Sequence, residues 1–131
     1  MKYLLDTNIC IYLINERPAG VLAKFKRHRI GDVGVSSVTV SELAYGVAKS
    51  GSARNRAALD AFLTPLTVIE YDTEAAFVYG ELRSVLERKG TPIGPLDLLI
   101  AAHALSRQLV LVTNNEKEFR RVGKLKVEKW V

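Results

Sequence analysis

Three carboxylates and one amide stand close to the ends of apolar segments that we expect to form the core. They are Asp6 after the first apolar segment, Glu42 in the first helical turn after the second apolar segment, Asp97 just after Pro95, and Asn115 after the last long apolar strand. In open α/β sheets the functional crevice lies beyond the carboxyl ends of the strands. We therefore expect all four side chains to face one rim of a sheet.

Carboxylates gathered at one rim repel each other unless a positive charge lies between them. The repulsion is about 4 kcal/mol per pair at a separation of about 4 Å and an effective dielectric constant near 20, and burial increases it. No Lys or Arg stands next to Asp6 or Asp97 in the sequence, and a helix N-terminus contributes only about 0.3 to 1 kcal/mol. A divalent cation is the better counterion. Oxygen ligands without His or Cys favour Mg²⁺ or Mn²⁺ over zinc.

Each acid also has a structural explanation that involves no chemistry. Asp6 could cap the helix after the first strand, and Glu42 stands three residues after Thr39, as in a capping box. Asp97 could complement a helix dipole, although a charge in so apolar a segment is unusual unless it faces a cavity or a metal. Asp97 is therefore the strongest single clue, whereas His103 is expected to be a core or rim histidine.

The elements that must position these acids alternate along the chain, and they predict an α/β fold. Apolar and β-branched runs predict strands, and a period of 3.6 residues predicts helices. Such alternation is typical of an open parallel sheet with helices on both faces. The expected strands cover 2–5, 33–38, 66–71, 109–112 and 126–131, and the expected helices cover 9–14, 18–28, 41–49, 53–63, 74–89, 96–107 and 116–121.

Length and composition predict one folded domain over residues 1–131. The chain has 48% apolar and 25% charged residues, so it is neither disordered nor collagen-like. The lone Cys10 excludes an intrachain disulfide framework, and no zinc-type Cys/His spacing is present. No export signal and no apolar run long enough for a membrane span is apparent, so we expect a cytoplasmic protein without a membrane partner.

The combination of these motifs resembles PIN-domain ribonucleases, and in particular the VapC toxin family. The resemblance implies a three-layer α/β/α sandwich around a parallel sheet of four or five strands, a homodimer that forms a higher assembly with an antitoxin, and an endoribonuclease restrained by a VapB-type antitoxin. It also assigns metal binding to Asp6, Glu42 and Asp97. The motifs that carry it are Leu5–Asn8, Ser36–Leu43, Gly94–Asp97 and Val112–Asn115 with Phe119.

The fourth acidic position of the family is not matched directly in this sequence. Many members carry an acid where this chain has Asn115, and Glu118, one helical turn further on, is the alternative. Asn8 and Thr113 resemble polar residues of the family that orient the carboxylates or the scissile phosphate. The fourth position therefore stays open between Asn115 and Glu118.

The resemblance also predicts an RNA substrate. The segment Lys89–Pro95 is similar to that of enterobacterial-type VapC toxins, which implies cleavage of initiator tRNA in its anticodon loop. The net charge of +5 becomes +8 when the three acids are left out, since 19 basic residues then face 11 acidic ones. Such a field attracts RNA. The candidate RNA-binding residues are Lys24, Lys26, Arg27, Arg29, Arg83, Arg88 and Lys89.

The resulting hypothesis is hydrolysis of a phosphodiester bond with one or two Mg²⁺ or Mn²⁺ ions, one of which lowers the pKa of water. In-line attack would leave a 5′ phosphate and a 3′ hydroxyl.

Three alternatives remain open: an RNA-processing PIN nuclease outside a toxin-antitoxin pair, a catalytically inert binding module, and a haloacid-dehalogenase-like phosphatase. The last expects an Asp where this chain has Asn8. An antitoxin helix is expected to dock on Tyr12, Leu13, Leu22 and Phe25.

Overall fold

The computed structural model describes residues 1–130, which form five strands and seven α-helices. One short 3₁₀ helix, Ile30–Asp32, precedes the second strand. The strands are β1 (Tyr3–Leu5), β2 (Val33–Ser36), β3 (Thr67–Ile69), β4 (Val110–Val112) and β5 (Val127–Glu128). The helices are α1 (Thr7–Asn15), α2 (Ala19–Lys26), α3 (Ser37–Ser50), α4 (Ala53–Leu63), α5 (Thr73–Arg88), α6 (Pro95–Ser106) and α7 (Glu116–Phe119).

The strands form one parallel sheet in the order β3-β2-β1-β4-β5. The chain starts in the central strand and adds strands first on one side of it and then on the other. The strand order therefore reverses at β1, and the crevice of an open α/β sheet forms at such a switch point. The carboxyl end of β1 is directly followed by Asp6, and that of the neighbouring β4 by Thr113.

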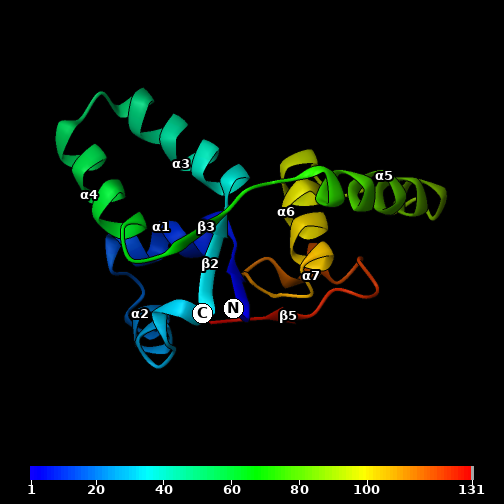
Figure 1. The fold of residues 1–131 in the computed structure, drawn as a ribbon, viewed down its shortest axis with the longest axis horizontal. Coiled ribbons are helices and arrows are strands. Elements are labelled where there is room, and N and C mark those ends of the chain that lie inside the picture. The colour runs from blue at the N-terminus through cyan, green and yellow to red at the C-terminus, as the bar shows by residue number, and fades with distance from the viewer. Residues whose placement is uncertain (131) are drawn as a thin grey trace.

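The two faces of the sheet pack against different helices, which gives the expected α/β/α layers (Figure 1). Tyr3 and Leu5 of β1 belong to a core shared with helices α1 to α4. Leu4 points the other way, into a core shared with α5, α6 and α7, because successive side chains of a strand alternate between faces. None of the helices in residues 1–130 has the length and apolarity needed to cross a bilayer.

Helix α3 begins four residues before its predicted start, and this corrects the interpretation of Glu42. Ser36 is the N-cap, because its Oγ accepts a hydrogen bond from Val38 N at 3.1 Å. The β-branched run after it is helical because packing overrides propensity. Thr39 is buried inside the helix rather than at its cap, so the predicted capping box is wrong. Glu42 lies in the second turn, not the first.

The other predicted elements are present with small shifts in their bounds. Asp72 caps α5 as expected, with its carboxylate accepting from Ala75 N at 3.0 Å. Pro95 opens α6. The last strand is confined to Val127–Glu128, and the predicted extension to Val131 ends outside the described residues. Trp130 is nevertheless buried, stacked on His28 and edge-on to Tyr3.

Gly34 in β2 lets two strands and the N-terminus pack closely, which gives a test of the sheet. A Cβ at Gly34 would lie 3.0 Å from the backbone oxygen of Thr67 and 2.7 Å from Met1 Sδ, whereas a Cβ at Gly80 in α5 would meet nothing within 4 Å. We expect Gly34→Ala to lower the free energy of unfolding by about 1–3 kcal/mol. The control Gly80→Ala should raise it by about 0.5–1 kcal/mol. Urea unfolding measures both changes, and equal stabilities of the two variants would contradict the packing described.

Candidate active site

Asp6 lies at the centre of the rim and is held on both carboxylate oxygens. Thr7 N donates to Oδ1 at 2.8 Å, and Thr113 Oγ1 donates to Oδ2 at 2.7 Å. Asp6 is buried, and burial is the main cause that raises its pKa, with smaller contributions from Glu42 and Glu118. The hydrogen bonds favour the ionised form but do not offset the burial. Asp6 is thus a carboxylate in a poorly solvated position with acidic neighbours.

Glu42 is joined to Asp6 through a single residue, Thr7. The Thr7 hydroxyl donates to Glu42 Oε1 at 2.7 Å, while its backbone nitrogen donates to Asp6. This contact spans 35 residues of sequence and fixes the second turn of α3 against the first turn of α1. Thr7 was not among the predicted site residues. The signal that could have identified it is a hydroxyl directly after an acid at a strand-to-helix junction.

Asp97 reaches the same rim from the first turn of α6. Its pKa is raised to about 6, mainly by burial and then by the negative charges of Asp6, Glu118 and Glu42. These Coulomb interactions show that the predicted acids from three separate segments are electrostatic neighbours. The N-terminus of α6 offers only a partial positive charge in return.

Glu118 joins this group, and Asn115 orients it. Asn115 Nδ2 donates to Glu118 Oε2 at 2.8 Å, and Gly94 N donates to Oε1 at 2.8 Å. These two bonds lower the pKa of Glu118, with that from Gly94 the larger cause. A Cβ built on Gly94 would lie 3.7 Å from Glu118 Oε1 and 3.8 Å from Asp97 Oδ2, so both acids flank one point. The geometry therefore places the charge of Glu118, oriented by Asn115, beside Asp97.

The two orienting residues predicted beside the acids differ in their surroundings. Thr113 is buried, and besides its bond to Asp6 it accepts from Asn115 N at 3.0 Å. A chain of hydrogen bonds thus runs from Asp6 through Thr113 and Asn115 to Glu118. Asn8 is exposed on α1 and is not part of that chain.

None of the rim acids forms an ion pair among the described residues. The three ion pairs found in residues 1–130 all join side chains four residues apart on helix surfaces: Arg56 with Asp60, Arg83 with Glu87, and Arg120 with Glu116. Within the same residues, no three His, Cys, Asp or Glu side chains converge closely enough to hold a metal ion. Asp6, Glu42 and Glu118 instead accept hydrogen bonds from hydroxyl, amide and backbone donors.

The predicted RNA-binding residues are distributed over two sides of the molecule. Lys24 and Lys26 lie in α2 and Arg27 directly follows it, on the opposite side of the fold from α5 (Figure 1), and Lys24 Nζ donates to Lys129 O at 3.3 Å. In contrast, exposed Lys89 begins the loop that leads to Gly94. Arg83, Arg88 and Arg29 are also exposed, and Arg83 is paired with Glu87.

Arg121 is a basic residue beside the acids that sequence reasoning did not identify. Its Nη1 donates to Pro92 O at 2.8 Å, and its charge lowers the pKa of Glu118. It thus anchors the loop before α6 on the segment after α7. This contact spans 29 residues, and no local pattern in the sequence points to it.

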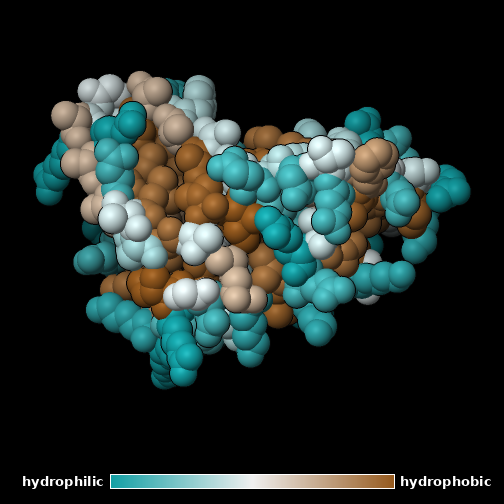
Figure 2. Space-filling model, in the orientation of Figure 1, coloured by the Kyte–Doolittle hydropathy of each residue, from teal (hydrophilic) through white to brown (hydrophobic). Residues whose placement is uncertain are grey.

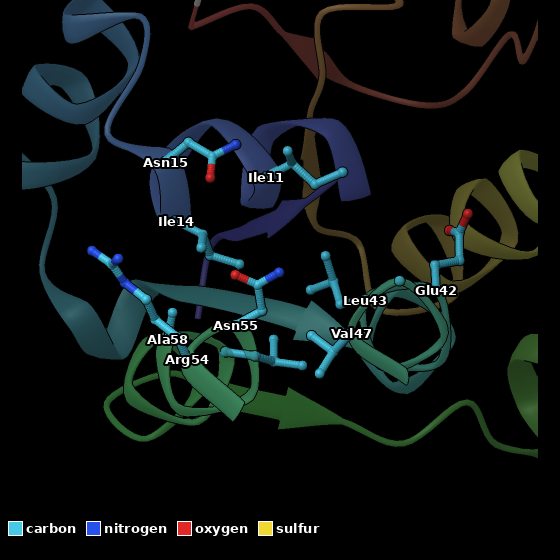
Figure 3. Close-up of a pocket in the computed structure, with 11 residues that line it drawn as sticks. Ile11, Ile14, Asn15, Glu42, Leu43, Val47, Arg54, Asn55 and Ala58 are labelled. Atoms are coloured by element: carbon cyan, nitrogen blue, oxygen red, sulfur yellow. The ribbon is translucent and has the colours of Figure 1, made fainter. Parts of the chain in front are cut away.

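An apolar groove of about 540 Å³ lies between α1, α3 and α4, with Glu42 at one end (Figure 3). Leu43 and Val47 of α3 face Ile11 and Ile14 of α1 across it. Figure 2 shows hydrophobic residues gathered below the α3–α4 arm with hydrophilic residues around them.

This groove is a second candidate docking face beside the predicted one. Of the predicted residues Leu13 is buried, whereas Tyr12, Leu22 and Phe25 are partly exposed while packing against the core. The groove adds apolar surface between α1, α3 and α4.

The comparisons with known proteins agree over the whole chain. The PIN domain model matches residues 3–125. A tRNA(fMet)-specific endonuclease VapC from Shigella flexneri is 47% identical over 131 residues, covering 99% of this chain and 98% of its own. The DNA-bound VapBC structure from Salmonella typhimurium has a TM-score of 0.92 and 43% identity, covering 100% of this chain and 99% of that one. VapBC2 of Rickettsia felis, bound to a promoter DNA fragment, has a TM-score of 0.89 and 42% identity, with both chains fully covered. The chain therefore belongs to the PIN-domain family, among the VapC ribonucleases.

Proposed function

We propose that this chain, acting as a single PIN domain, is the toxin of a type II toxin-antitoxin pair and hydrolyses RNA at the rim formed by Asp6, Glu42 and Asp97. The observation that carries the proposal is the electrostatic coupling of these three acids without a basic partner. Their positions at the switch point of the sheet agree with where such sheets bind ligands.

The donor chemistry of the rim suits Mg²⁺ or Mn²⁺. All four acidic side chains offer oxygen ligands. Burial, and then the neighbouring acids, raise the pKa values of Asp6 and Asp97, so a cation at the rim would stabilise their ionised forms. We propose that Asp6, Glu42 and Asp97 hold the ion. Both oxygens of Glu118 already accept protein hydrogen bonds, so its share is to add charge beside Asp97. A bound ion of this kind activates water and neutralises charge on a phosphate.

The protein groups around the rim have separate tasks in this proposal. Thr7 and Thr113 fix the Asp6 carboxylate on both oxygens, and Thr7 also holds Glu42. Asn115 and Gly94 hold Glu118 beside the first turn of α6. Such preorganisation lowers the reorganisation needed in the transition state. Basic residues near this rim, among them Lys89 and Arg121, would attract the RNA backbone.

We propose initiator tRNA as the substrate, with the cut in its anticodon loop. The support is the Shigella flexneri relative, named a tRNA(fMet)-specific endonuclease, at 47% identity. The segment Lys89–Pro95 lies directly before Asp97 and is anchored by Arg121. This arrangement places the segment where it could contact RNA that enters the rim.

We further propose that a VapB-type antitoxin lays an apolar segment into the α1–α3–α4 groove, and that the toxin is a homodimer within that complex. The solved structural relatives are VapBC complexes, and Glu42 at one end of the groove would attract a basic antitoxin residue. An inert binding module would not need the buried charges at the rim, which argues against that alternative. The phosphatase alternative lacks an acid at Asn8. A nuclease outside a toxin-antitoxin pair would lack an antitoxin gene next to its own.

Asp97→Asn tests the catalytic proposal. Replacing the carboxylate by an amide of the same shape removes one ligand charge, so we expect RNA cleavage with Mg²⁺ to fall by about 10²–10³-fold. Asp72→Asn is the matched control, because Asp72 caps α5 in an exposed position and Asn caps helices as well as Asp does. Cleavage of initiator tRNA is followed on a gel, and equal rates for wild type and Asp97→Asn would reject the assignment.

The metal-free protein should lose stability as the pH rises. The pKa of Asp97 is 3.8 in the unfolded chain and about 6 in the folded one. Between these pH values the folded chain therefore binds more protons than the unfolded chain, and the free energy of unfolding falls as the pH rises. After allowance for solvent screening we expect a loss of about 1–2 kcal/mol between pH 4 and pH 7 that is absent in Asp97→Asn. Urea unfolding in EDTA measures it, and Mn²⁺ at pH 7 should restore the stability of wild type. Identical pH dependence of the two proteins would contradict the charge coupling.

Ile11→Asp tests the docking groove. Ile11 lines the groove and is 41% exposed, whereas Ile30 is 44% exposed outside it. A charge inside an apolar interface should weaken antitoxin binding by about tenfold to a hundredfold, while Ile30→Asp leaves it unchanged. Calorimetric titration with the cognate VapB measures both affinities. An unchanged affinity for Ile11→Asp would show that the antitoxin docks elsewhere.

A further inference from the structure

His103 is a fully buried histidine in α6 that takes no part in the site proposed above. It lies two turns after Asp97 in the same helix, and its exposed fraction is 0%. Its Nδ1 is 2.8 Å from Ser36 Oγ, a contact between residues 67 positions apart. The ring also lies edge-on to Tyr71, with 5.5 Å between ring centroids. A polar ring at such depth needs a reason, since Leu or Phe would fill the space without a buried polar atom.

Ser36 is the residue at which three elements meet. It ends β2, it caps α3 by accepting from Val38 N, and it is bonded to His103 of α6. The next residue, Ser37, accepts from Tyr71 N at 3.0 Å. The N-terminus of α3 is therefore fixed from the side of α6 and from the segment after β3.

The two helices that meet at this joint each carry a rim acid. Glu42 stands six residues after Ser36 in α3, and Asp97 stands six residues before His103 in α6. A small rotation of α3 against α6 would therefore move one carboxylate relative to the other. The Ser36–His103 contact is the one buried side-chain hydrogen bond between these two helical segments within residues 1–130.

The surroundings of the joint favour a neutral imidazole. Ser36 Oγ already accepts from Val38 N, so its hydroxyl either donates to Nδ1 or accepts from it. In both cases Nε2 has no hydrogen-bond partner among the described residues. Burial, and then the charge of Arg107 at the end of the same helix, lower the pKa of His103, whereas Asp72 and the backbone and charge of Glu70 act in the opposite direction. The ring thus acts as a fixed dipole in the core and not as a charge.

We propose that His103 is a positioning residue: it holds the N-terminus of α3 against α6 and so keeps Glu42 and Asp97 at one rim. This role rests on the proposed ribonuclease activity, since it concerns the geometry of the same acids. His103 does not touch RNA or metal. Its effect reaches the reaction through Ser36 and the two helices.

The test compares His103→Leu, which fills the space without the hydrogen bond, with His103→Asn, whose amide can occupy the position of Nδ1. We expect His103→Leu to lower kcat for RNA cleavage by about tenfold or more, since small misplacements of reacting groups have effects of this size. The Mn²⁺ concentration that half-saturates thermal stabilisation should rise by about tenfold. KM should stay within about threefold, because RNA contacts are untouched. His103→Asn should recover part of both losses.

Two further variants separate positioning from general destabilisation. Ile100→Val trims a buried side chain of the same helix that packs in the core shared with α5 and α7, and it should lower the melting temperature without moving kcat or the Mn²⁺ midpoint. Ser36→Gly removes the other partner while keeping an acceptable helix cap. Ser36→Gly should lower kcat and weaken Mn²⁺ binding as much as His103→Leu does. The variant that carries both substitutions should show little further loss, as expected for two residues that act as one unit.

The outcomes that overturn each proposal are distinct. If wild type neither cleaves RNA nor binds Mn²⁺, the proposed ribonuclease site is rejected and the role of His103 falls with it. If wild type does both, and kcat and the Mn²⁺ midpoint are unchanged in His103→Leu and Ser36→Gly, only the positioning role is rejected. Should His103→Leu fail to fold, Ser36→Gly alone decides by the same criteria.

Discussion

Like charges held close together at the end of a parallel sheet are the constraint on which the rest of this structure depends. Asp6 is buried at the carboxyl end of the central strand. Burial, and then the charges of Glu42 and Glu118, raise its pKa, and burial, and then the charges of Asp6, Glu118 and Glu42, raise the pKa of Asp97. A protein can keep such charges only if its scaffold is stiff or a cation lies between them. The described residues provide the stiff scaffold, and the proposed ion provides the cation.

The stiffness comes from contacts between segments that are distant in sequence. The two cores on either side of the sheet are continuous with β1, so the strand that ends at Asp6 cannot shift without disturbing both. Around the rim, Thr7, Thr113 and Asn115 use hydroxyl and amide donors to fix three carboxylates. Beneath it, the bond between Ser36 and His103 joins the helices that carry Glu42 and Asp97. The acids are therefore held by the fold and not by their own interactions, which are repulsive.

Site residues could be predicted from the sequence where a charged residue interrupts an apolar segment. Contacts between segments far apart in the sequence could not be predicted. A carboxylate in the apolar segment around Asp97 has few structural explanations, so it pointed to the rim. The start of α3 was misplaced because Thr39 and Glu42 match a capping box locally, while packing selects Ser36 as the cap. The position of Glu118 beside Asp97 depends on Gly94, 24 residues earlier, which no periodicity encodes. The α1–α3–α4 groove was not predicted, because apolar residues of a core and of a groove look alike in sequence.

The central claim is that the rim acids share a divalent cation, and anomalous diffraction from a crystal soaked in Mn²⁺ tests it most directly. We expect an anomalous peak at about 2.1 to 2.3 Å from carboxylate oxygens of Asp6 and Asp97, with Glu42 turned toward it from Thr7. No peak at the rim at a Mn²⁺ concentration that saturates binding in solution, or a peak bound only by other residues, would contradict the claim.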